Sequence, residues 1–292
     1  MSRYLFSITI LLSIAVGLLF PSVTLLWSGY IIPLLAMLMF FSALRVETKE
    51  LYKTDPKELL ALLFFVFVIM PLLSLPFKLS EPLIFIGVLV ALSSPSAAAT
   101  AFFSSFLGGD TMLGVSISFI ASLLSVVTLP LTLQLLAGTT IPIDQSKILV
   151  ILLEVILLPI LIALLSKKLF RKAVDVINIH RDSQLTVMFL VASGTIGIGH
   201  EIIVSNEYQF IELTAAMLVI VLFGATLAYL FGKRYRKKAA ITFFVGTGVK
   251  NATLAFAIML ELFGPLAVLP MVANLIAQCI IMVLFEIFGN RS

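Results

Sequence analysis

The stretch FFVGTGVKNATLAF, residues 243–256, decides the fold. It lies in a long apolar run, yet it carries Gly246, Gly248, Lys250 and Asn251 near its middle. A charged side chain at bilayer depth costs between about 2.5 and well over 10 kcal/mol, depending on the measure used. Other parts of the chain must therefore compensate for the charge of Lys250.

The composition supports a membrane setting for this stretch. The chain has 292 residues, of which 61% are hydrophobic and 12% charged, whereas soluble domains are about 25% charged. Cys279 is the single cysteine, and His180 and His200 are not spaced as a metal motif, so we expect no metal and no cofactor. The basic residues form short clusters between apolar runs, which indicates membrane topology rather than nucleic-acid binding.

Ten apolar runs are long enough to cross a bilayer, which needs about 20 residues as helix. The predicted spans are 4–26, 28–45, 57–77, 82–107, 111–137, 147–167, 184–204, 209–232, 238–262 and 265–288.

Lysine and arginine positions give this topology an orientation, because cytoplasmic loops are enriched in them. With the amino terminus inside, only Lys78 and Lys147 fall outside, and Lys250 lies within a span. The cytoplasmic group is Arg3, Arg45, Lys49, Lys53, Lys57, Lys167, Lys168, Arg171, Lys172, Arg181, Lys233, Arg234, Arg236, Lys237, Lys238 and Arg291. We therefore predict a multi-pass protein of the cytoplasmic membrane with both termini in the cytoplasm.

The spans divide into two halves, residues 1–137 and 147–288, on either side of the turn AGTTIPIDQS. Each half has an odd number of spans, so the second half enters the membrane in the opposite orientation. The fold class predicted is an all-α membrane protein of ten transmembrane helices, built as two inverted five-helix repeats.

The fourth span of each half is interrupted. In the first half the break is ALSSPSAAATAFFSS, residues 91–105, with Pro95 in mid-span, and in the second it is the stretch around Gly246 and Gly248. A kink at Pro95 and close packing at the two glycines would be a purely structural alternative. Breaks at matching places in two halves, with Lys250 beside one of them, favour the binding site of a transporter.

Each break also exposes the beginning of a half-helix, whose free N–H groups carry a partial positive charge. Ser96 is predicted to cap the first half-helix, and the second resumes near Asn251. Beside Lys250, these ends would form an electropositive pocket. An anion is the substrate that such a pocket would bind.

At these residues the chain resembles the bile acid:sodium symporter family. The segments that carry the resemblance are LLAMLMFFSALRVE (34–47), SSPSAAATAFFSSFLGGDTMLGVSIS (93–118) and VGTGVKNATLAFAIMLELFGPLAVLP (245–270). The resemblance implies a panel domain of helices 1, 2, 6 and 7 and a core domain of helices 3 to 5 and 8 to 10. It also implies that the broken helices 4 and 9 cross in the core, which moves against the panel during transport.

The sodium ligands of that family are mostly absent at the corresponding positions. Its Ser-Asn pair after the first break corresponds to Thr100 and Ala101, and its hydroxyl pair on the fifth helix to Gly114 and Ser118. Sodium needs several oxygen ligands, by the logic that governs other hard cations. Ala101 and Gly114 supply no side-chain oxygen.

The second break departs further from the sodium-ligand pattern of the family. The family's Glu and Gln correspond to Gly246 and Lys250, while its following Asn is kept as Asn251. An ammonium at the place of a cation would repel sodium, so we hypothesise that Lys250 replaces the ion and that transport is sodium-independent. A lysine removed from water can also exchange its proton near neutral pH, so protons are an alternative coupling ion.

Other residues complete the predicted site. Glu154 is a carboxylate inside the sixth span and a candidate partner of Lys250, and Asp110 is predicted to cap the fifth helix. The predicted substrate-binding residues are Lys250, Asn251, Ser96, Thr100, Ser118, Thr247 and Glu154, with Pro95, Gly246 and Gly248 as the broken-helix residues.

The function predicted is secondary active transport of a small organic anion, by alternating access of the core against the panel. A sodium-coupled symporter of the same family is one alternative, and a non-transporting sensor or channel is another. Arsenite efflux, in a related branch, uses a cysteine beside the first break, where Ser96 is the nearest residue here. No nucleophile elbow or metal-protease motif appears, so we do not expect an enzyme.

Overall fold

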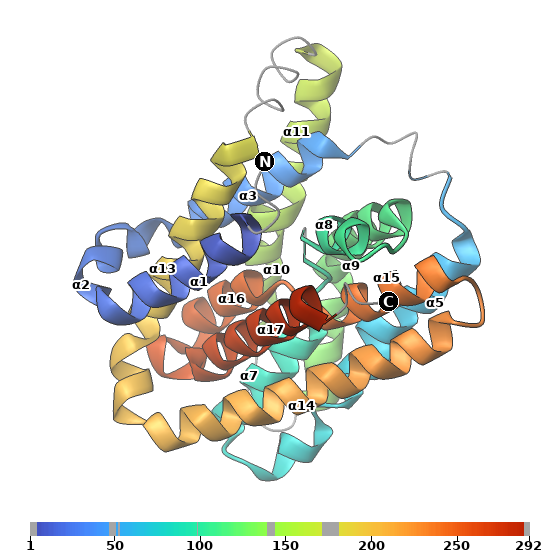
Figure 1. Cartoon of the computed structure of the whole chain (residues 1–292). Helices are drawn as coiled ribbons and strands as arrows, with labels where there is room; N and C mark the ends of the chain where they lie inside the picture. Colours follow the sequence, from blue (N-terminus) through green and yellow to red (C-terminus); the bar gives the residue numbers. More distant parts are fainter. Residues whose placement is uncertain are drawn as a thin grey trace.

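A computed structural model of the chain describes residues 5–46, 51, 53–97, 99–138, 144–170 and 181–288. These residues form helices joined by short turns, with no named strand among them (Figure 1). Several sequence predictions fall outside the described residues: His180, the basic residues Arg3, Lys49, Arg171, Lys172 and Arg291, and positions 139–143 of the turn between the predicted halves.

Helix is found within each of the ten predicted ranges. In the first half the elements are α1 (Leu5–Leu19), α2 (Pro21–Thr24), η1 (Leu25–Tyr30), α3 (Ile31–Arg45), α5 (Pro56–Phe64), η2 (Phe65–Ile69), α6 (Met70–Leu72), η3 (Leu75–Leu79), α7 (Pro82–Ser93), α8 (Thr100–Phe106) and α9 (Thr111–Ala137). In the second half they are α10 (Gln145–Leu152), η4 (Leu153–Leu157), α11 (Leu158–Leu169), α13 (Arg181–Ser205), α14 (Glu207–Gly232), α15 (Lys237–Gly248), α16 (Ala252–Phe263), η5 (Pro265–Val268) and α17 (Leu269–Phe288).

Six continuous helical stretches of the described chain are long and apolar enough to cross a membrane. The remaining apolar helices are shorter, among them α7 and α16 on either side of the predicted breaks. The six long stretches are Pro21–Leu44, Pro56–Leu79, Thr111–Ala137, Gln145–Leu169, Leu185–Ser205 and Glu207–Gly232.

The first predicted span extends several residues beyond the end of the first helix. It was expected to run to residue 26, but α1 ends at Leu19 and a new helix begins at Pro21. Phe20 between them has φ −130° and ψ 54°, outside the helical region. A proline at the first helical position has no N–H to satisfy, so Pro21 starts a helix rather than continuing one.

Both predicted breaks are interruptions of helix. The first lies between Ser93, the last residue of α7, and Thr100, the first of α8, and the second between Gly248 and Ala252. The prediction that Ser96 caps the first half-helix is wrong, because α8 begins four residues later and its N-cap position, Ala99, has no side-chain bond. The prediction for Asp110 is confirmed, since its side chain accepts the N–H groups of Met112 and Leu113 at the start of α9.

Two helices contain a π-helical turn at the same distance from a proline. The turn η2 is followed by Met70 and Pro71, and η4 is followed by Leu158 and Pro159. Proline lacks the N–H that an α-helical turn requires, and a single π turn is one way to accommodate it. Both turns free backbone carbonyls inside apolar helices.

The helices pack in two groups around the breaks. Helix α13 contacts α1 and α3, α3 also contacts α11, and α14 packs against α15 and α17. In Figure 1, α16 and α17 lie between α1 and α13 on one side and α14 on the other.

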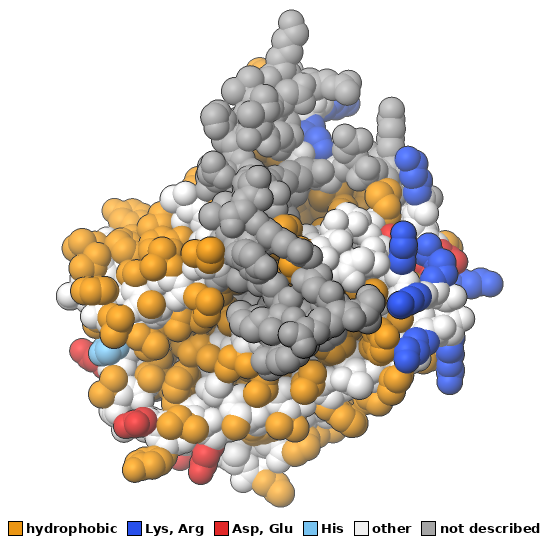
Figure 2. Space-filling model, in the orientation of Figure 1, with side chains coloured by type: hydrophobic (Ala, Val, Ile, Leu, Met, Phe, Trp, Pro, Cys, Tyr) orange, Lys and Arg blue, Asp and Glu red, His pale blue; other side chains and the backbone are white. Residues whose placement is uncertain are grey.

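Basic side chains gather at one end of the molecule. Figure 2 shows an apolar belt between a cluster of basic side chains, over the ends of α5 and α15, and acidic side chains on the opposite side. The exposed basic residues near these helix ends are Lys53, Lys57, Lys233, Arg234, Arg236, Lys237 and Lys238. An apolar belt between two polar ends is the surface expected of a protein that spans a bilayer.

The close approach of α13 to α2 depends on Gly197. A Cβ atom at this position would lie 1.9 Å from Thr24 Oγ1, and the Thr24 side chain is fully buried. We expect Gly197→Ala to lower the free energy of unfolding by about 1–2 kcal/mol, because overpacking costs about 1–3 kcal/mol and exceeds the gain in helix propensity of about 1 kcal/mol.

Thermal unfolding in detergent measures this effect. Gly29→Ala is the matched control, since a Cβ at Gly29 meets no atom within 4 Å. Equal stability of the two variants would show that α2 and α13 do not depend on this contact.

Candidate functional site

The two breaks pair with each other through the backbone. Ser96 and Lys250 form an antiparallel bridge, in which the Ala97 N–H donates to Val249 O and the Asn251 N–H donates to Pro95 O, each at 2.9 Å. Peptide groups freed in a membrane-spanning helix must find partners inside the protein. Each break supplies such partners for the other.

Side chains complete this arrangement. Ser96 Oγ donates to Gly246 O at 2.6 Å, and the Lys250 N–H donates to Gln278 Oε1 on α17 at 3.0 Å. Ser118 Oγ on α9 lies 3.0 Å from Ala97 O and 2.8 Å from Gly114 O, so its single proton serves one of the two. Ser96 is therefore a connector between the breaks.

Asn251 begins the helix that follows the second break. Its side chain accepts the Leu254 N–H at 3.1 Å and caps the twelve-residue α16, which begins near Asn251 as the sequence predicts. Asn251 Oδ1 also accepts the Thr253 hydroxyl at 3.0 Å. The amino terminus of α16, with its partial positive charge, thus lies at the break.

The Lys250 side chain is buried, with 2% of its surface exposed. Its Nζ donates to the carbonyl oxygen of Val66 in η2 at 3.0 Å. No ion pair to Lys250 is found within the part of the chain that the structure describes. The ammonium therefore connects the second break to the helix that contains α5 and η2.

A cavity of about 290 Å³ lies against the breaks. One wall comes from α1, α3, α11 and α13, with Ile10, Leu38, Met39, Ser42, Ala43, Val46, Ile160, Leu185, Met188, Val191 and Ala192. The other comes from the breaks and α8, α9, α16 and α17, with Ala97, Ala99, Ala101, Phe102, Phe103, Val115, Ser118, Phe119, Ser122, Val249, Lys250, Asn251, Ala252, Thr253, Leu275, Gln278 and Cys279. Apolar side chains dominate both walls, and no carboxylate is found among the described residues that line them.

The cavity brings together three of the predicted substrate-binding residues: Lys250, Asn251 and Ser118. Lys250 lines it, although its ammonium is bonded to Val66, which is not part of the lining. Ser96 is buried between the breaks and does not line the cavity.

Three further predictions lie elsewhere. Thr100 and Thr247 are fully buried outside the cavity lining, and neither hydroxyl has a hydrogen-bond partner among the described residues. Glu154 lies in η4 with its side chain exposed, away from the cavity and without an ion pair to Lys250 within the described chain. Of the broken-helix residues, Pro95 and Gly246 accept hydrogen bonds from the opposite break, and Gly248 ends α15.

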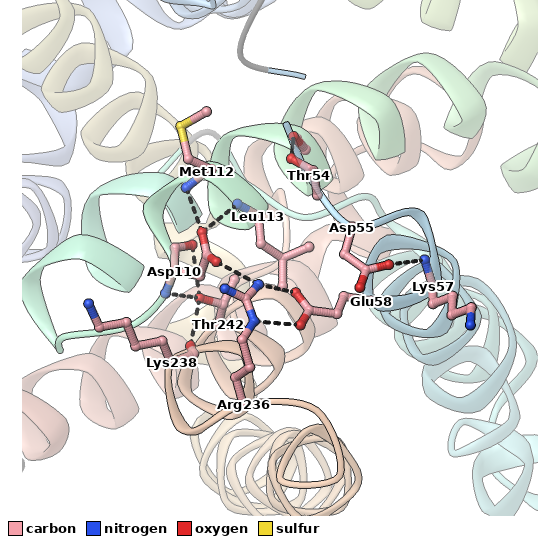
Figure 3. A network of polar contacts seen from close by, with 11 residues as sticks. Thr54, Asp55, Lys57, Glu58, Asp110, Met112, Leu113, Arg236, Lys238 and Thr242 are labelled. Carbon is pink, nitrogen blue, oxygen red and sulfur yellow. Dashed lines mark hydrogen bonds and ion pairs between the residues drawn. The ribbon is translucent and has the colours of Figure 1, made fainter. Parts of the chain in front are cut away.

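A second polar cluster holds the basic end of the molecule. Figure 3 shows the Arg236 guanidinium between the carboxylates of Glu58 and Asp110, at 2.5 Å and 2.9 Å. Glu58 is 2% exposed, and its hydrogen bond raises the pKa of Arg236 above its already high usual value. The Asp110 N–H also donates to Thr242 Oγ1 at 2.8 Å. These contacts join α5, α9 and α15.

Sequence reasoning missed several of these partners. Gln278 and the Arg236–Glu58 pair were not predicted, nor was the role of Val66. Gln278 had a signal, because it is a polar residue four positions after Asn274 in the apolar run of α17. For Val66 the sequence offered only an indirect signal, which is the proline Pro71 within an apolar span.

Comparison with known proteins identifies the family of the chain. The profile described as the Sodium Bile acid symporter family matches residues 32–205. The chain belongs to the sodium bile acid symporter family. It is thus a multi-pass membrane transporter by family, and the resemblance inferred from the sequence is confirmed.

Relatives in this family carry transport names. The chain is 26% identical over 279 residues to the protein of Bacillus subtilis (strain 168) named "Uncharacterized sodium-dependent transporter YocS", covering 91% of this chain and 84% of that one. It is 23% identical over 212 residues to the "Probable sodium/metabolite cotransporter BASS2, chloroplastic" of Oryza sativa subsp. japonica, covering 71% of this chain and 50% of that one.

Proposed function

We propose that this member of the family is a secondary transporter of a small organic anion that works without sodium, with the Lys250 ammonium in the role of the cation. Transport would proceed by alternating access, with a core domain moving against a panel domain. The observation that carries the proposal is the buried Lys250, whose ammonium is bonded to a helix carbonyl beside the paired breaks.

The position of the cavity supports alternating access. One wall comes from α1, α3, α11 and α13, the helices expected to form the panel, and the other from helices expected to form the core. Relative motion of the two groups would open such a cavity to either side. We further propose that the spans form two inverted five-helix repeats, 1–137 and 147–288.

The charge distribution supports an orientation in the cell membrane. Basic residues gather at the end formed by α5 and α15, and the exposed Glu201, Glu207 and Glu212 lie at the start of α14 or just before it. By the preference of basic residues for the cytoplasm, the first end would be cytoplasmic. Both termini would then lie in the cytoplasm.

The lining of the cavity favours an anion of modest size with an apolar body. Lys250 is its one charged residue among those described, and the amino terminus of α16 lies beside it. A volume of about 290 Å³ is just below the range of typical ligand pockets, which hold about 300–1,000 Å³. A monocarboxylate would place its charge at the break and its carbon chain among the apolar residues.

Sodium independence is supported by what surrounds the breaks. Ala101, Gly114 and Gly246, at positions that correspond to sodium ligands of the family, have no side-chain oxygen. No carboxylate lines the cavity in the described part of the chain. The ammonium of Lys250 would repel a second cation.

The test is the thermal stability of the purified protein in detergent with pyruvate, lactate, benzoate or cholate, in sodium or choline buffer. We expect one of these anions to raise the unfolding temperature equally in both salts, and Lys250→Gln to lose that response. Lys237→Gln, which removes the same charge at an exposed position, is the control and should respond as wild type does. Stabilisation that appears only in sodium would contradict the proposal.

The names of the relatives favour a second candidate, a sodium-coupled symporter of the same family. In that case sodium would be required for anion stabilisation, and Lys250→Gln would keep the sodium response. The same experiment distinguishes the two candidates.

A further inference from the structure

The Val66 carbonyl, which accepts a hydrogen bond from the Lys250 ammonium, has no donor within the Val66 helix itself. In η2 the Met70 N–H donates to Phe65 O, five residues back, and is therefore engaged. The residue five positions after Val66 is Pro71, which has no N–H. In the π-helical register, Val66 O thus has no backbone donor.

A carbonyl without a donor is costly at this place. Val66 is fully buried, and water is excluded from the interior of a membrane protein at this depth. The Lys250 ammonium, equally in need of an acceptor, lies 3.0 Å from it. The contact gives Val66 O a donor and gives one of the three N–H groups of the ammonium an acceptor.

The second π turn of the chain provides a comparison. In η4 the Leu158 N–H donates to Leu153 O, and Pro159 stands five residues after Glu154. The Glu154 carbonyl is left free in the same way, yet no side-chain donor to it is found among the described residues. A proline after a π turn therefore does not by itself require a lysine. The contact between Lys250 and η2 is a feature that the π turn alone does not explain.

We propose that Pro71 is a positioning residue for Lys250. By leaving Val66 O without a backbone donor, Pro71 reserves this oxygen for the ammonium and so fixes the charge between the second break and the helix that contains η2. For its meaning in transport the inference rests on the proposed role of Lys250. The contact itself is testable without any transport assay.

The experiment is a double-variant cycle in thermal unfolding of the full chain in detergent. Lys250→Met leaves Val66 O without a donor, and Pro71→Ala restores a backbone N–H that can reach it. We expect Pro71→Ala to raise the unfolding temperature in the Lys250→Met background and to lower it, or leave it unchanged, in the wild-type background. The two shifts should differ by about 2 °C or more.

Pro159→Ala is the matched control, because it restores an N–H to the corresponding carbonyl of η4. Its shift should be the same in both backgrounds. If Pro71→Ala cannot be purified, Pro71→Ser is used in the same cycle. If Pro71→Ala can be purified only in combination with Lys250→Met, that result would also support the inference, because the two changes would then depend on each other.

Equal shifts for Pro71→Ala in the two backgrounds would overturn the inference, and the proposed function would be untouched. A sodium requirement in the anion panel would overturn the proposed function while leaving this cycle unchanged. The two failures are therefore distinguishable.

Discussion

Replacing Lys250 with methionine is expected to reduce anion uptake about 100-fold without lowering the stability of the substrate-free protein. An anion held about 6 Å from the ammonium, at an effective dielectric constant of about 20, gains about 3 kcal/mol, which corresponds to about 100-fold in affinity. Uptake of the stabilising anion into proteoliposomes measures the loss.

The stability of the substrate-free protein should not fall as uptake does, because two contributions to the free energy of unfolding oppose each other. The freed Val66 carbonyl costs about 1–3 kcal/mol, while removal of a buried ammonium that has no ion pair in the described chain recovers several kcal/mol. We therefore expect the unfolding temperature to stay level or rise. Lys237→Met, at the exposed start of α15, the helix that precedes the second break, should change neither uptake nor stability. A large loss of stability in Lys250→Met would instead mark a purely structural lysine.

Replacing Arg236 with alanine is expected to lower the free energy of unfolding by about 3–5 kcal/mol. The change leaves the Glu58 carboxylate, 2% exposed, without its guanidinium partner, and a buried charge stripped of its partner costs about this much. Chemical denaturation in detergent, followed by circular dichroism, measures the change.

The cause can be separated from a general loss of contacts. The double variant Glu58→Leu with Arg236→Met removes both charges and should recover most of the stability, because apolar replacements of a buried ion pair are often neutral. Lys238→Ala, two positions along α15 and exposed, should change stability by less than about 0.5 kcal/mol. If Arg236→Ala matches Lys238→Ala, the pair does not hold α5 against α15.

Local signals in the sequence were sufficient for several features. Proline and glycine within apolar runs marked both breaks, because these residues weaken a helix wherever it lies. Asp110 was recognised as a cap, since a cap acts on N–H groups two or three residues away. Such features depend on neighbouring residues alone.

Features that depend on tertiary contacts could not be predicted. Ser96 has the chemistry of a cap, but its hydroxyl bonds to Gly246 across the paired breaks. Val66 and Lys250 are 184 residues apart, so the sequence shows a freed carbonyl and a buried amine without indicating that they meet. Glu154 was a reasonable candidate by residue type, and only its position on the outer side of η4 separates it from the cavity.

The Lys250 site also suggests how one family could include transporters with and without sodium. In the proposed account, the fixed ammonium of Lys250 supplies at the paired breaks the positive charge that a bound ion would otherwise supply. A fixed charge would remain in place through the transport cycle, so the sodium gradient would no longer drive uptake. Transport in this chain would then follow the gradient of the anion, or of protons if the ammonium exchanges them.

The most direct test of sodium-independent transport is uptake into proteoliposomes of the anion that stabilises the protein, in choline buffer with no sodium on either side. We predict the same initial rate as in sodium buffer, and no change when a sodium gradient is imposed. Uptake that starts only when sodium is added outside would contradict the account and restore sodium symport to this chain.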